Sequence, residues 1–224
     1  KIHDGDTLNL RDGRRIRILG INAPELGRDG GADQAYARDA MRAVETFFAG
    51  GRQAYLQFDR ELQDTYERYL AHVYRRDGAN LERYLLVRGL AYQVVIPPNL
   101  TLADCLAHAE RDAKAARKGV WRLHPVAATQ VRTGGFQRVL GKVASVEFDD
   151  IWRIRFEGGF SAVIKPQDQA NFVRITVAAW LGQQLEVRGW VYPLRGRGRE
   201  SGAGLLPWQL RLYTPAAVEV REAE

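Results

Sequence analysis

Cysteine is almost absent from this sequence, with Cys105 as the single example in 224 residues. One cysteine excludes an internal disulfide and any zinc site built from several cysteines, so stability must come from packing. Long apolar runs are missing too, since no stretch approaches the roughly 18 residues of a membrane span. We therefore predict no membrane partner, and the oligomeric state is open, with a monomer assumed.

A targeting segment is also missing at the start of the chain. The opening residues KIHDGDTLNL lack the charged and apolar regions of a signal peptide. The compartment is therefore open. Of the alternatives, a periplasmic or secreted location is favoured, with any leader absent from this chain.

Acidic residues are outnumbered by basic ones, 27 against 33, which gives a net charge of +6. Each half, 1–128 and 129–224, carries +3, so neither is a basic tail. Most of the basic residues are arginine, whose planar guanidinium grips phosphate bidentately and stacks on bases. This balance favours polyanionic partners, although a GC-rich genome would give the same excess of arginine.

The first half has the pattern of a small barrel with helices. Residues 11–13 form a turn signal between two short strands, and apolar residues at helical spacing predict a helix over 34–48. Asn80 is a cap residue, and Thr101 with Asp104 resembles a capping box that opens a helix ending at Gly119. Further strands are predicted at 53–58 and 70–74.

The second half shows three predicted strands, a helix-like stretch and two more strands. This is the order of an OB-fold, a five-stranded barrel that binds oligonucleotides and oligosaccharides. We therefore predict a mainly β fold with helices, an OB-type barrel over 1–128 and a second OB-like barrel over 129–224. The predicted strands of the second half are 137–146, 151–156, 160–164, 184–192 and 208–213, and the helix-like stretch is 167–180.

Four sequence motifs in the first half occur in a characteristic order. DGDT at residues 4–7 is followed by RILGINAPE at 17–25, then by DTYERYLAHVY at 64–74 and VRGLA at 87–91. Alone, each motif is weak, and acidic residues near turns are usually structural. Together they resemble the staphylococcal nuclease (thermonuclease) family over roughly residues 1–122.

The resemblance implies a set of site residues with complementary roles. Cleaving a phosphodiester with water requires a hard cation, a base for the water and positive charge near the transition state. The implied metal ligands are Asp6, Asn22 and the Ala23 carbonyl, an oxygen-only set that suits Ca²⁺. The implied catalytic residues are Glu25, which positions and deprotonates water, and the phosphate-clamping Arg17 and Arg68.

The resemblance also implies supporting residues around this centre. Tyr66 would contact the nucleotide, and its alternative is an ordinary surface tyrosine. Asp64 would order the turn that holds Arg68, and Thr7 would hydrogen-bond within the carboxylate cluster. Asp4 would stand behind Asp6 or simply close the turn. Position 22 departs from the family pattern, which has Asp there, so we expect weaker calcium binding.

A Gly/Arg loop at 195–204 separates the last two predicted strands of the second half. It places Arg195, Arg197 and Arg199 at alternate positions, where an OB-fold borders its binding face. We predict that these arginines contact substrate. The alternative is a solvated hairpin loop.

These features favour one function and leave others open. The favoured hypothesis is a calcium-dependent nuclease that hydrolyses DNA or RNA phosphodiesters, preferring single strands, with metal-activated water attacking phosphorus. By resemblance, the 5′-oxygen would leave. The alternatives are a degenerate nuclease-fold domain that binds nucleic acid or protein without cutting, and a C-terminal barrel with a purely structural or protein-binding role.

Overall fold

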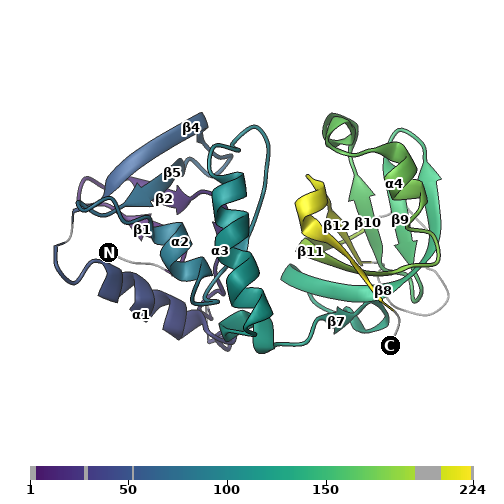
Figure 1. The fold of residues 1–224 in the computed structure, drawn as a ribbon, viewed down its shortest axis with the longest axis horizontal. Helices are drawn as coiled ribbons and strands as arrows, with labels where there is room; N and C mark the ends of the chain where they lie inside the picture. Colours follow the sequence, from purple (N-terminus) through teal and green to yellow (C-terminus); the bar gives the residue numbers. More distant parts are fainter. Residues whose placement is uncertain (1–3, 28–29, 52, 195–207, 223–224) are drawn as a thin grey trace. The chain divides into compact units, whose positions relative to one another are not determined.

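The computed structural model describes residues 4–27, 30–51, 53–194 and 208–222. The chain divides into two compact units, 1–124 and 125–224 (Figure 1). The predicted boundary was residue 128. The division lies slightly earlier because β7 (Val126–Ala127) pairs with a strand of the second unit, and Ala128 is buried in the second core.

The strands of the first unit form a four-stranded sheet and a separate pair. In β2 the isoleucines Ile16 and Ile18 are buried, so alternation turns Arg15 and Arg17 to the opposite face. This places the arginines outside the core. The sheet order is β1 (Thr7–Asn9), β2 (Arg15–Ile18), β5 (Tyr69–Tyr74) and β4 (Tyr55–Gln63), and the pair is β3 (Ile21–Asn22) with β6 (Tyr92–Gln93).

The helices of this unit are α1 (Ala37–Phe47), α2 (Leu81–Leu86) and α3 (Ala103–Ala115), and the 3₁₀ turn η1 (Gly119–Arg122) follows α3. Figure 1 shows α1 and α2 together beneath the sheet. The predicted cap of α2 is confirmed, since the Asn80 side chain accepts a hydrogen bond from Arg83 N at 2.7 Å.

Two predictions about helix starts are wrong. Helix α1 begins at Ala37 rather than at residue 34, because Tyr36 adopts a left-handed backbone with φ of 69°. Thr101 does not cap α3. Its backbone N–H instead donates to Asp59 Oδ2 at 3.0 Å, and Leu102 takes the cap position without a side-chain hydrogen bond.

The second unit is a closed five-stranded barrel with the OB order. Its strands are β8 (Gly135–Phe148), β9 (Trp152–Phe156), β10 (Ser161–Ile164), β11 (Gln184–Pro193) and β12 (Trp208–Arg211). The sheet runs β8-β9-β10-β12-β11, and pairing of β11 with β8 closes it. Strands β10 and β12 are parallel. The predicted mainly β fold class, with an OB-like second barrel, is confirmed.

Short elements complete this unit. The helix expected over 167–180 is two pieces, η3 (Pro166–Asn171) and α4 (Arg174–Ala178), because Phe172 between them turns into the core in an extended conformation. The edge strand β13 (Val218–Arg221) pairs with β11 and was not predicted. The remaining 3₁₀ turns are η2 (Ala128–Gln130) and η4 (Pro215–Ala217).

A charge cluster joins three strands of the second unit. Glu186 of β11 lies between Arg138 of β8 and Arg221 of β13, and its carboxylate accepts from both guanidinium groups. Burial alone would raise the pKa of Glu186, but the hydrogen bonds and positive charges of Arg138 and Arg221 hold that pKa below its usual value. The cluster therefore ties three strands through one ionised carboxylate.

Within the described ranges, no helix combines the length and apolar character needed to cross a membrane.

Candidate active site

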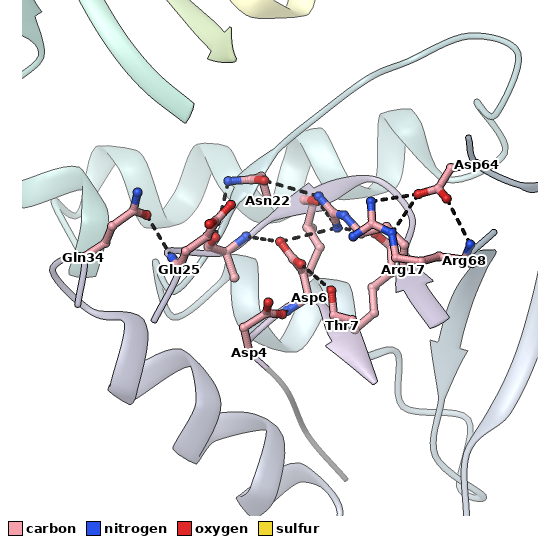
Figure 2. A network of polar contacts seen from close by, with 12 residues as sticks. Asp4, Asp6, Thr7, Arg17, Asn22, Glu25, Gln34, Asp64 and Arg68 are labelled. Carbon is pink, nitrogen blue, oxygen red and sulfur yellow. Dashed lines mark hydrogen bonds and ion pairs between the residues drawn. The ribbon is translucent and has the colours of Figure 1, made fainter. Parts of the chain in front are cut away.

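Asp6 immediately precedes β1, and Figure 2 shows its side chain near those of Thr7 and Asn22. Its Oδ2 accepts from Ala23 N at 2.8 Å, and its Oδ1 accepts from Thr7 Oγ1 at 3.2 Å. Gly5 permits this approach, because a Cβ there would lie 2.6 Å from the Ala23 Cβ and 2.8 Å from the Ala40 Cβ. The glycine of the DGDT motif therefore allows the close packing that places Asp6 beside Ala23.

The Asp6 carboxylate is buried among polar groups. Burial raises its pKa, the Asp4 carboxylate raises it further, and Arg17, Ala23 N and Thr7 oppose the rise. Asp4 accepts a hydrogen bond from Asp6 N at 3.1 Å, so it closes this turn. A supporting role of Asp4 behind Asp6 stays a prediction.

Arg17 contacts two of the candidate metal ligands, Asp6 and Asn22. Its Nη1 donates to the carbonyl oxygens of Ile18 and Ile21 at 2.8 and 2.9 Å and lies 3.4 Å from Asp6 Oδ2. Its Nη2 donates to Asn22 Oδ1 at 3.3 Å. The guanidinium is therefore ordered by four oxygens at the edge of the cluster.

The donor chemistry at this point fits a hard cation. Asp6, Asn22 and Ala23 carry a carboxylate, an amide oxygen and a backbone carbonyl, and the Asn22 Nδ2 donates to Ala23 O at 3.3 Å. In the described part of the chain, no three His, Cys, Asp or Glu side chains gather as a metal site. The donors that Asp6, Asn22 and Ala23 offer are oxygens of mixed type, which are the kind of ligand that Ca²⁺ takes.

Glu25 is exposed on the connection that follows β3. Gln34 holds its backbone from both sides: Glu25 N donates to Gln34 Oε1 at 2.9 Å, and Gln34 N donates to Glu25 O at 3.0 Å. Asp33 adds a second tie, accepting from Gly27 N at 2.9 Å. The two residues close the loop that carries Glu25 and leave its carboxylate accessible.

Gln34 and Asp33 were not predicted as site residues. Their role depends on closure of the 25–34 loop, which no periodicity signals. The one sequence signal was the placement of two polar residues, Asp33 and Gln34, where the predicted helix begins.

Arg68 is fixed by Asp64 in the turn between β4 and β5 (Figure 2). Asp64 Oδ2 accepts from Arg68 Nε at 2.8 Å and lies 2.7 Å from its Nη2, while Oδ1 accepts from the backbone N–H groups of Tyr66 and Arg68 at 2.9 and 3.0 Å. Burial opposes the shift, but these hydrogen bonds lower the pKa of Asp64. The carboxylate therefore stays ionised and holds the guanidinium in one orientation.

Tyr66 projects from the same turn and is 70% exposed. The Arg68 guanidinium lies 5.5 Å from the centre of its ring. The ring thus presents an accessible aromatic face beside the second arginine. The predicted substrate contacts Arg195, Arg197 and Arg199 lie outside the described residues.

Comparison with known proteins identifies the family of the first unit. Residues 15–123 match the family described as "Staphylococcal nuclease homologue". A thermonuclease of Staphylococcus intermedius is 30% identical over 125 residues, which cover 54% of this chain and 73% of that protein. The chain belongs to the staphylococcal nuclease homologue family.

Other relatives of the chain carry different descriptions. The succinoglycan biosynthesis protein ExoI of Rhizobium meliloti is 27% identical over 139 residues, covering 60% of this chain and 69% of that protein. An uncharacterized endonuclease of Escherichia coli O157:H7 is 28% identical over 124 residues, covering 54% and 73%. At the level of the family, the comparisons support a nuclease of the hydrolase class.

Proposed function

We propose that this protein is a calcium-dependent nuclease that hydrolyses phosphodiester bonds of single-stranded DNA or RNA. The observation that carries the proposal is the placement of two ordered arginines beside an oxygen-only donor cluster. The Arg17 Nη1 lies 3.4 Å from Asp6 Oδ2, and Arg68 forms an ion pair with Asp64 in the β4–β5 turn. A phosphate set between them would meet positive charge on two sides.

The residues that would hold Ca²⁺ are Asp6, Asn22 and the Ala23 carbonyl. When bound, the cation would supply charge neutralisation at the phosphate and promote ionisation of a water molecule. Asp6 brings the only formal negative charge of this set, so we expect weak binding without substrate. The substrate phosphate would then complete the coordination shell.

Glu25 would orient the attacking water and accept its proton. Its carboxylate is exposed to incoming water, while Gln34 keeps its backbone in place. Arg17 and Arg68 would stabilise the charge that builds on the phosphate oxygens as the water attacks in line and the 5′-oxygen leaves. Each arginine has N–H groups beyond those bonded to protein oxygens, and these groups would bind the phosphate.

The preference for single strands rests on the exposed ring of Tyr66. An aromatic face can stack on a base only when the base is splayed out of a duplex. The second barrel has the fold of oligonucleotide-binding domains, and its proposed role is to add contacts along the strand. The contribution of Arg195, Arg197 and Arg199 to those contacts stays a prediction.

The competing function is a binding module that does not cut. The observation in its favour is Asn22, which replaces an acidic ligand and whose Oδ1 accepts from Arg17. Cleavage separates the two functions. Labelled single-stranded DNA should be cut by the wild type with calcium and not with a chelator, and Glu25→Gln should reduce the rate about 100-fold or more. A wild type that binds the strand but never cuts would establish the binding module instead.

A further inference from the structure

A groove of about 490 Å³ lies between the β1–β2 hairpin and the β4–β5 turn, beside the site described above. Its volume falls in the usual range for small-molecule sites, roughly 300–1,000 Å³. Arg14, Arg15 and Tyr69 contribute the cationic and aromatic part of the wall. The rest of the lining consists of Asp12, Gly13, Gln63 and Glu67.

The groove adjoins the phosphate clamp through Arg15. Arg15 and Arg17 are on the same face of β2, two residues and so roughly 7 Å apart along the strand. The Arg15 Nη2 also donates to the Tyr66 carbonyl at 2.8 Å, which ties the hairpin to the turn that carries Arg68. A strand of nucleic acid leaving the clamp over Tyr66 would therefore meet Arg15 next.

The groove offers matched partners for a whole nucleotide. The Arg15 guanidinium is exposed and can take a phosphate, and the Arg14 guanidinium lies 5.8 Å from the centre of the Tyr69 ring, which a base can share. Asp12 holds Arg14 with an ion pair of 2.7 Å, and the exposed Gln63 and Glu67 of the lining supply acceptors for the N–H groups of a base. These acids oppose a bare phosphate, so the lining favours a nucleotide over a free anion.

We propose that this groove is an additional nucleotide subsite, in which Arg15 binds the neighbouring phosphate of a single strand and Arg14 with Tyr69 holds its base. The proposal rests on the proposed nuclease function and extends its substrate to a chain rather than one nucleotide. Arg14 and Arg15 are then specificity residues that select for longer strands.

The test compares a thymidine dinucleotide with a thymidine octanucleotide. The double variant Arg14→Ala, Arg15→Ala should reduce the ratio of kcat/KM for the octanucleotide to that for the dinucleotide by about tenfold, because one nucleotide is no longer held by charge-assisted hydrogen bonds. Arg15→Lys should restore part of the ratio. The control is Arg42→Ala, Arg111→Ala, which removes two exposed arginines of α1 and α3, one of them also paired with an aspartate.

Binding of the labelled octanucleotide in chelator, followed by anisotropy against salt, completes the test. The double variant should flatten the slope of log affinity against log salt by about 0.7 for each phosphate that the protein no longer neutralises. An unchanged ratio and an unchanged slope would overturn the subsite, and so would equal effects in the control. If the wild type binds but never cuts, and the double variant still flattens the slope, the nuclease function fails while the subsite stands.

Discussion

Replacing Asp64 by Asn is expected to slow cleavage by freeing Arg68 while the turn keeps its shape. The amide oxygen of Asn can still accept from the backbone N–H groups of Tyr66 and Arg68, as Asp64 Oδ1 does at 2.9 and 3.0 Å. The amide nitrogen cannot replace Oδ2, which receives Arg68 Nε at 2.8 Å. The variant thus removes the ionic half of the interaction only.

The magnitude follows from the partial exposure of the pair. Two hydrogen bonds to a charged group contribute about 1.5–3 kcal/mol each when buried, but the Arg68 and Asp64 side chains are 26% and 18% exposed. Discounted for solvent screening, the pair should contribute about 1–2 kcal/mol to the orientation of Arg68. That change corresponds to a decrease of about 5- to 30-fold in kcat/KM.

The assay is steady-state cleavage of single-stranded DNA with calcium, beside thermal unfolding of each variant. Asp77→Asn is the matched control, because Asp77 holds Arg75 and Ala79 N in an equivalent turn at the other end of β5. Asp64→Asn should lower kcat more than it raises KM, and Asp77→Asn should leave both unchanged. Wild-type rates in Asp64→Asn, or equal decreases in both variants, would refute the positioning role.

Three further predictions concern the metal site, the Glu25 loop and the second barrel. Asn22→Asp should tighten calcium binding about tenfold by adding a charged ligand, and equal affinities by calorimetry, with and without nucleotide, would show that position 22 is not a ligand. Gln34→Ala should lower kcat about tenfold with little change in KM, because the Glu25 backbone is held less firmly. The control Gln57→Ala removes only an exposed hydrogen bond with Tyr74 and should leave both constants unchanged. An effect of Gln34→Ala confined to KM would contradict this role. Glu186→Gln should destabilise the second unit by about 3 kcal/mol, because Arg138 stays buried without its charged partner. Since the folded pKa of Glu186 is lowered, this stabilisation is present above the unfolded pKa of about 4.3 and is lost as the pH falls through the folded value, so denaturant titrations should show wild type and variant converging in acid.

Local patterns in the sequence predict much of this fold. The alternation of Ile16 and Ile18 with Arg15 and Arg17 defines a strand with an arginine face, and Asn80 marks the start of α2 through an ordinary cap. The OB order of the second unit also follows from strand and turn signals. These features depend on neighbours in the chain, which is why sequence reveals them.

The remaining features depend on contacts between distant residues. Thr101 has the sequence pattern of a capping residue, but its backbone N–H is taken by Asp59, 42 positions away. Gln34 leaves the expected helix to hold Glu25, and the short strands β7 and β13 form by pairing with β8 and β11. Tertiary packing determines these partners, so no local periodicity in the sequence predicts them.

The proposed cleavage of nucleic acid by this cluster with calcium can be measured directly. The measurement is the rate of cleavage of labelled single-stranded DNA by the wild type and Glu25→Gln, each with calcium and with chelator. We expect rapid cleavage by the wild type with calcium, none in chelator, and a rate about 100- to 10,000-fold lower for Glu25→Gln. Absence of cleavage by the wild type with calcium, or equal rates for the two proteins, would contradict the proposed function.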